Sequence, residues 1–105
     1  MCGISCIYSK IPLNSIESRI LSMNNSIIHR GPDGGNTKIH GNNIALGHRR
    51  LSIIDLDQRA NQPMLSNSGK NQIIFNGEIF NFEEIKKELK EFYVFHTQSD
   101  TEVLL

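Results

Sequence analysis

The fold is decided by the opening stretch Met1-Cys2-Gly3-Ile4-Ser5-Cys6-Ile7-Tyr8, which is rich in residues that favour β-structure. We predict a strand over Gly3–Tyr8, and pairing in a sheet would hold the neighbouring Cys2 in place. Removal of Met1 would leave a thiol and a free α-amine on Cys2, and this amine could accept the thiol proton. Cys2 is therefore a candidate nucleophile. Taken alone, the dipeptide Met1-Cys2 fits a frayed end without function better than a catalytic residue.

Length, charge and cysteine content exclude several classes of protein. The 105 residues are enough for one domain at most. Lys and Arg balance Asp and Glu at 11 each, so no basic excess favours nucleic acid or an anionic membrane. No signal peptide and no membrane-spanning apolar run is recognisable. Cys2 and Cys6 on one strand would lie too far apart for a disulfide, so we expect a reducing, cytoplasmic environment.

The remaining pattern mixes helices and strands without strict alternation. Asn14 and Glu17 form a capping box before a helix that ends at Gly31-Pro32. Its expected apolar face consists of Ile16, Ile20, Met23 and Ile27. Further strands are predicted over 37–39 and 44–54, joined by a turn at Gly41-Asn42-Asn43, and over 72–76 and 93–96. A loop is predicted over 55–70, and helices are predicted to start at Asn81 and Ser99. This order favours an α+β fold.

The pair Asn76-Gly77 follows a predicted strand and has two interpretations. Asn-Gly is the favoured pair of a tight hairpin turn, and that interpretation is the more probable one for the pair alone. In the other interpretation, the Asn76 amide and the Gly77 backbone N–H form an oxyanion hole.

Two charged residues are candidates for substrate binding. Arg50 interrupts an apolar strand, where a partly buried guanidinium would need a bidentate anion such as a substrate carboxylate. An ordinary ion pair would satisfy it as well. Asp100 begins a predicted helix, where the helix dipole alone favours a carboxylate. It could equally accept hydrogen bonds from a substrate ammonium.

Metal and phosphate sites are not supported by the spacing. His29, His40, His48 and His96 do not form close pairs with each other or with the cysteines, as a structural zinc site requires. The glycine-rich stretch 31–35 lacks the strand, lysine and helix of a phosphate-binding loop. We therefore predict no metal site.

Six motifs taken together, in this order, carry a resemblance to a known family. They are Met1-Cys2-Gly3-Ile4, His29-Arg30-Gly31-Pro32-Asp33-Gly34, Gly47-His48-Arg49-Arg50-Leu51-Ser52-Ile53-Ile54-Asp55, Gln62-Pro63-Met64, Phe75-Asn76-Gly77-Glu78-Ile79-Phe80-Asn81 and Ser99-Asp100-Thr101-Glu102. The sequence resembles the amino-terminal glutaminase domain of glutamine-hydrolysing asparagine synthetases, a class II glutamine amidotransferase domain. The resemblance implies an N-terminal-nucleophile hydrolase fold, an αββα four-layer sandwich of which this chain would form the N-terminal part.

The resemblance also implies roles for individual residues. Cys2 would attack the glutamine amide, and Asn76 and Gly77 would hold the oxyanion. Arg50 would bind the substrate α-carboxylate, and Asp100 would bind the α-amine with help from Glu78. The backbone around Ile53 and Ile54 would line the pocket.

The same resemblance implies partners outside residues 1–105. The remainder of the glutaminase domain and a synthetase domain would follow, and ammonia would pass to that synthetase domain to convert aspartate to asparagine. ATP and magnesium are expected only there, with no cofactor in the glutaminase domain, and a homodimer is among the assemblies allowed. Two alternatives stay open: a glutaminase domain serving sugar or peptide amidation, and a truncated, non-catalytic binding module.

Overall fold

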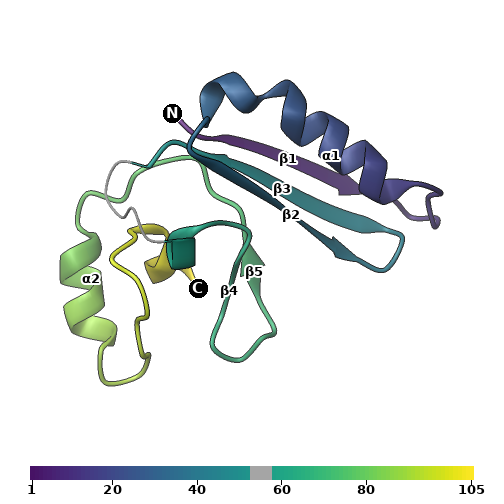
Figure 1. Cartoon of the computed structure of the whole chain (residues 1–105). Helices are drawn as coiled ribbons and strands as arrows, with labels where there is room; N and C mark the ends of the chain where they lie inside the picture. The colour runs from purple at the N-terminus through teal and green to yellow at the C-terminus, as the bar shows by residue number, and fades with distance from the viewer. Residues whose placement is uncertain (53–57) are drawn as a thin grey trace.

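The computed structural model describes residues 1–52 and 58–105 and has the predicted α+β composition. Its strands are β1 (Gly3–Tyr8), β2 (Gly34–His40), β3 (Ile44–Arg50), β4 (Met64–Leu65) and β5 (Gln72–Ile73), its α-helices are α1 (Ile16–Ser26) and α2 (Phe82–Leu89), and its 3-10 turns are Ile28–Arg30, Gln58–Ala60 and Thr101–Leu104. An antiparallel sheet in the order β1-β3-β2 carries α1 on one face, the β4-β5 pair lies on the side of the sheet away from α1, and α2 lies beyond one end of the sheet (Figure 1). The four-layer sandwich stays a prediction.

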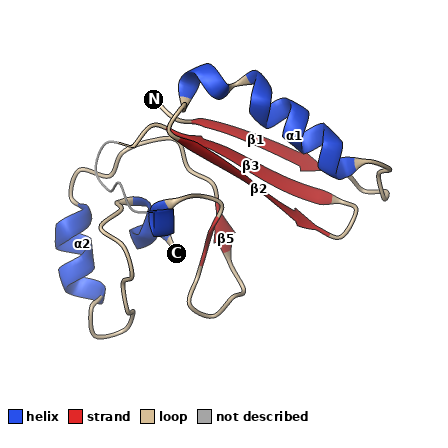
Figure 2. Cartoon of the chain, in the orientation of Figure 1, coloured by secondary structure: helices blue, strands red, loops and turns tan. Residues whose placement is uncertain are grey.

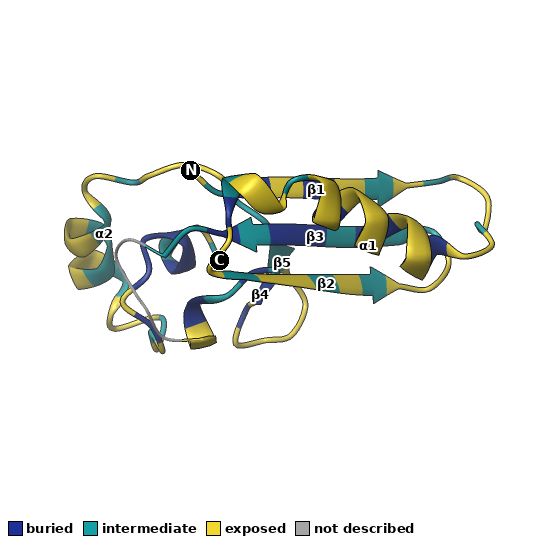
Figure 3. Cartoon of the chain, turned by 45° about the horizontal axis from the view of Figure 1, so that its top comes forward, coloured by how far each residue is buried: buried dark blue, intermediate teal, exposed yellow. Residues whose placement is uncertain are grey.

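The central strand β3 is predicted correctly at its start but not at its end. It pairs with β1 from Gly3 opposite Arg49 to Tyr8 opposite Ile44, and it is the most buried strand of the sheet (Figure 3). The strand ends at Arg50, whose carbonyl accepts the N–H of Asp33 at 3.0 Å. The predicted continuation to residue 54 is therefore wrong for 51–52, and residues 53–54 lie outside the described residues.

Helix α1 buries a narrower face than its apolar pattern predicts. Ile16 and Ile20 pack against Ala45 of β3, and these three residues form the hydrophobic core between α1 and the sheet. Met23, expected on the same face, is 40% exposed, whereas the polar Asn24 is buried. Asn24 is stabilised there because its side-chain amide donates to the backbone carbonyls of Asn36 and His48.

The predicted helix cap at Asn14 is also wrong. The residue before the first helical turn is Ser15, in a left-handed conformation with φ 59°, and no side chain caps the helix. The turn predicted at Gly41-Asn42-Asn43 is present, and Gly41 supplies the positive φ of 59° that joins β2 to β3.

The second half of the chain, residues 58–105, contains little regular structure (Figure 2). The strand predicted over 72–76 shortens to Gln72–Ile73, and the predicted loop over 55–70 contains a 3-10 turn and β4. The helix predicted at Asn81 is present as α2, whereas the one predicted at Ser99 is a single 3-10 turn.

The strand predicted over 93–96 is wrong, because side chains rather than a neighbouring strand bind this segment. The carboxylate of Glu102 accepts the N–H groups of His96 and Thr97 at 2.9 and 2.8 Å and the Thr97 hydroxyl at 2.7 Å. Lys86 of α2 donates to the Thr97 carbonyl at 2.7 Å. These contacts fix the backbone that leads to Asp100.

Replacing Gly31 by alanine should destabilise the fold. A Cβ at Gly31 would lie 2.5 Å from the Arg49 carbonyl oxygen and the Arg50 nitrogen, so the backbone of β3 would have to move. We expect Gly31→Ala to lower the free energy of unfolding by roughly 1–3 kcal/mol, measured by denaturant unfolding of the intact protein. Gly34→Ala is the control, since its Cβ would meet nothing closer than 3.7 Å. Equal stability of both variants would contradict the prediction.

Candidate active site

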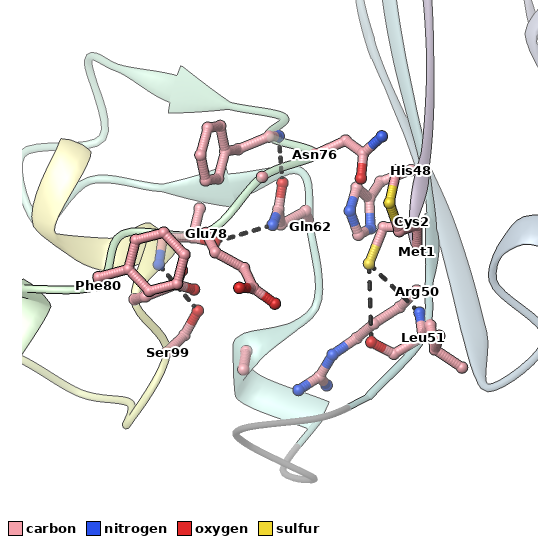
Figure 4. Close-up of a pocket in the computed structure, with 15 residues that line it drawn as sticks. Met1, Cys2, His48, Arg50, Leu51, Gln62, Asn76, Glu78, Phe80 and Ser99 are labelled. Atoms are coloured by element: carbon pink, nitrogen blue, oxygen red, sulfur yellow. Dashed lines mark hydrogen bonds between the residues drawn. The ribbon is translucent and has the colours of Figure 1, made fainter.

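A cavity of about 420 Å³ lies between the sheet and the second half of the chain. Its lining comprises Met1, Cys2, His48, Arg50, Leu51, Ala60, Gln62, Phe75, Asn76, Gly77, Glu78, Phe80, Ser99, Asp100 and Thr101. In Figure 4, Cys2, His48, Arg50 and Leu51 lie on the side of the sheet, and Gln62, Glu78, Phe80 and Ser99 lie opposite them. The volume is within the range of small-molecule sites.

The Cys2 side chain is held at the edge of this cavity by the backbone after β3. The Leu51 N–H donates to Cys2 Sγ at 3.3 Å, and the thiol faces the Leu51 carbonyl at 3.7 Å. On the other side, Arg30 Nε donates to the Cys2 carbonyl at 3.1 Å. Cys6 is exposed, and both thiols are free. Arg30 was not among the predicted site residues, because its motif contributed only to the family resemblance.

Asn76 and Gly77 do not form a hairpin turn. Strand β5 ends at Ile73, and the described residues that follow it contain no further strand, so the turn interpretation is wrong. Instead the Asn76 side chain extends toward His48 and Cys2 (Figure 4). Nucleophile candidate and oxyanion-hole candidates therefore share one cavity.

Arg50 is buried, with 8% of its surface exposed, as its position in an apolar strand suggested. Its Nη1 donates to the side-chain oxygen of Asn61 at 2.9 Å, and Arg50 lines the cavity. A guanidinium has five N–H donors in a planar fork. The bond to Asn61 thus helps to fix the orientation of the side chain at the cavity.

The two acidic candidates, Asp100 and Glu78, line the cavity from the side opposite the sheet. Asp100 is buried, and its Oδ2 accepts the backbone N–H of Ile79 at 2.8 Å. This bond connects Asp100 to the segment that follows Asn76 and Gly77. Glu78 is exposed, and its carboxylate points toward the cavity (Figure 4). The predicted pocket residues Ile53 and Ile54 lie outside the described residues.

His48 lines the cavity, although its residue type and spacing had raised it only as a possible metal ligand. Only 1% of its surface is exposed. Neither ring nitrogen makes a hydrogen bond of good geometry to the described residues. Burial lowers its pKa to about 4; the nearby backbone of Phe75 partly offsets this effect, and the charge of Arg50 adds to it. His48 is thus neutral at pH 7.

Within residues 1–52 and 58–105, no cluster of three or more His, Cys, Asp or Glu side chains could hold a metal ion. In the same part of the chain, no helix has the length and apolar character needed to cross a membrane.

Lowering the pH should reduce the free energy of unfolding, because buried His48 resists protonation in the folded protein. Above pH 6.5 the ring is neutral in both states, whereas between 6.5 and about 4 only the unfolded chain takes up the proton. The free energy of unfolding should therefore fall by up to about 3 kcal/mol over this window. Denaturant unfolding of the intact protein at stepped pH measures the fall, and His48→Gln should lose less stability over the same window. A ring that titrates near its ordinary pKa in NMR spectra of the folded protein would contradict the prediction.

Known proteins resemble this chain over its full length. A family model described as a glutamine amidotransferase domain matches residues 1–105. The glutamine-hydrolysing asparagine synthetase 1 of Bacillus subtilis is 44% identical over 109 aligned residues, covering all of this chain and 17% of that protein. A probable glutamine-hydrolysing asparagine synthetase of Schizosaccharomyces pombe is 36% identical over 106 residues, covering all of this chain and 19% of that protein.

The amidase chry2 of Gibberella zeae is 33% identical over 116 residues, which again cover all of this chain and 17% of the relative. The chain thus spans less than a fifth of the length of these relatives. Because the family model covers every residue, the chain belongs to the family of glutamine amidotransferase domains.

Proposed function

We propose that this chain hydrolyses the side-chain amide of glutamine through a thioester on Cys2 and supplies the ammonia to an ATP-dependent synthetase domain. Family membership supports glutamine as the substrate. The observation that carries the mechanism is the single cavity lined by Cys2 and by Asn76 and Gly77. Acyl transfer needs a nucleophile and oxyanion donors on one cavity, together with a base that takes the proton of the nucleophile.

The chemistry begins once Met1 has been removed and the α-amine of Cys2 is free. The amine takes the thiol proton, and the sulfur attacks the amide carbon of glutamine. The carbonyl electron pair moves to oxygen, and the resulting anion accepts hydrogen bonds from the Asn76 amide and the Gly77 N–H. The C–N bond then breaks, and the leaving nitrogen takes the proton from the α-ammonium and departs as ammonia. Water hydrolyses the thioester, which releases glutamate and regenerates the thiol.

The charged groups of the cavity suit the two ends of an amino acid. Arg50 would bind the α-carboxylate, since its guanidinium lines the cavity and a planar guanidinium matches a carboxylate. Asp100 would bind the α-ammonium, since its bond to Ile79 uses only part of the acceptor capacity of a carboxylate. Glu78 would assist, and the pocket roles of Ile53 and Ile54 stay predictions.

The acceptor of the ammonia is inferred from relatives whose names describe glutamine-hydrolysing asparagine synthetases. We propose aspartate as the acceptor, with ATP and magnesium bound in a synthetase domain beyond these residues. The cytoplasmic location, the four-layer sandwich and a homodimer stay predictions. The protein that includes the proposed synthetase domain should form asparagine when it is given glutamine, aspartate, ATP and magnesium. Glutamine hydrolysis without asparagine would instead favour an acceptor such as a sugar or a peptide.

Cys2 should be the residue that reacts with substrate. A glutamine analogue with an electrophilic carbon in place of the amide should label the intact protein once per chain, because the analogue places this carbon at the sulfur. Mass spectrometry should locate the label on Cys2 and find that Met1 has been removed. Cys2→Ala should abolish labelling, whereas Cys6→Ala, which changes an exposed thiol, should leave it unchanged. Absence of label on a folded protein without Met1 would favour the non-catalytic binding module.

Asn76→Ala should slow catalysis without weakening glutamine binding. Loss of one oxyanion donor costs about 2.7–4 kcal/mol of transition-state stabilisation, so kcat should fall roughly 100- to 1,000-fold. Steady-state glutaminase assays of the intact protein should show this fall with KM little changed. Asn81→Ala is the matched control, since Asn81 is exposed and its side chain caps no helix. A change in KM alone would contradict the role of Asn76.

A further inference from the structure

Gln62 is a buried side chain that connects two segments of the proposed active site. It is 6% exposed and lies on the cavity wall opposite Cys2 (Figure 4). Its Oε1 accepts the backbone N–H of Phe75 at 2.5 Å, and its Nε2 donates to the Thr101 hydroxyl at 3.1 Å. A backbone N–H can only donate, so the bond to Phe75 fixes which end of the amide faces Thr101.

Each hydrogen bond of Gln62 goes to a residue that is next in sequence to a proposed substrate-binding residue. Phe75 precedes Asn76, the oxyanion donor, and Thr101 follows Asp100, the proposed ligand of the ammonium. The amide therefore sets the separation between the segment that holds the reacting carbonyl and the segment that holds the α-amine. Asp100 adds a second connection between these segments through Ile79.

The residue before Gln62 extends this arrangement to the sheet. Asn61 accepts from Arg50 Nη1, so the dipeptide 61–62 contacts the proposed binding residue for the α-carboxylate as well. The dipeptide 61–62 thus helps to position Arg50, Asn76 and Asp100, which would bind different parts of glutamine. Few buried apolar side chains lie nearby to do this by packing, since Ala60 and Met64 are the buried apolar residues among those described after residue 57.

We propose that Gln62 is a positioning residue of the glutaminase site, which holds the oxyanion donors at the correct distance from the binding site for the α-amine. The proposal rests on the function proposed above and adds a residue that acts through Phe75 and Thr101. Loss of the Gln62 amide would leave the half-buried N–H of Phe75 without its partner. The segment would shift to recover a partner and carry Asn76 with it.

Three variants of the intact protein separate this role from a general effect on folding. Gln62→Met keeps the shape and removes both bonds, so kcat should fall and KM should rise, with kcat/KM lower by roughly 10- to 100-fold. Thr101→Val removes only the bond next to Asp100 and should mainly raise KM. Thr101→Ser keeps the hydroxyl and should recover most of that loss. Gln72→Met is the matched control, since Gln72 lies on β5, hydrogen-bonds His40 of β2 and is not among the residues that line the cavity.

The outcomes distinguish this inference from the proposed function. Wild-type protein that hydrolyses glutamine, with a folded Gln62→Met variant of unchanged kcat and KM, would overturn the role of Gln62 alone. Thr101→Ser as damaging as Thr101→Val would do the same, because the hydroxyl would then be irrelevant; this pair carries the test if Gln62→Met does not fold. Wild-type protein without glutaminase activity or labelling would overturn both proposals.

Discussion

The antiparallel register between β1 and β3 is the constraint on which the proposed site depends. Because Gly3 lies opposite Arg49, the next residue outward on β1, Cys2, comes beside Leu51 and Arg50. One hydrogen-bond ladder thus places both the nucleophile and the guanidinium. A shift of the register by one residue would turn every side chain of β1 to the opposite face and remove the sulfur from the cavity.

The second half of the chain is held in place mainly by polar contacts. Among the residues described after residue 57, two buried side chains are apolar and seven are polar or charged. Ile16, Ile20 and Ala45 form the core under α1, away from the cavity. On the cavity side, Gln62 and Glu102 supply hydrogen bonds at 2.5–3.1 Å to backbone and hydroxyl groups. Directional bonds fix distances more sharply than a few apolar contacts do, which suits a site that must align several groups.

The sequence predicted the parts of the structure that local patterns control. Strand β1 follows from its β-forming residues, and the turn at Gly41 from a residue that tolerates positive φ. Tertiary contacts decided the rest. Met23 matched the apolar spacing of α1, yet Asn24 is buried because the carbonyls of Asn36 and His48 accept its amide. The apolar run at 93–96 fitted a strand, but Glu102 binds its backbone instead.

The candidate site was predictable to a similar extent. Cys2, Arg50, Asn76 and Asp100 were chosen for their chemistry and their motifs, and all four line the cavity. Arg30 and Gln62 were not chosen, since each acts on backbone atoms distant in sequence, and no spacing rule reports such a contact. His48 was considered only as a ligand, because burial without a hydrogen-bond partner is visible only in three dimensions.

The arrangement of charges explains how such a site would select its substrate. Arg50 belongs to the sheet and Asp100 to the second half, so a bound amino acid would connect the two halves through its carboxylate and ammonium groups. Both side chains are buried, and an amide lacking either group would lose one of the two charged contacts of the proposed binding mode. A site built to hydrogen-bond a substrate group rejects an analogue without that group far more strongly than apolar shape does. Glutamine would thus be favoured by the same contacts that bring Asn76 and Cys2 together on its amide.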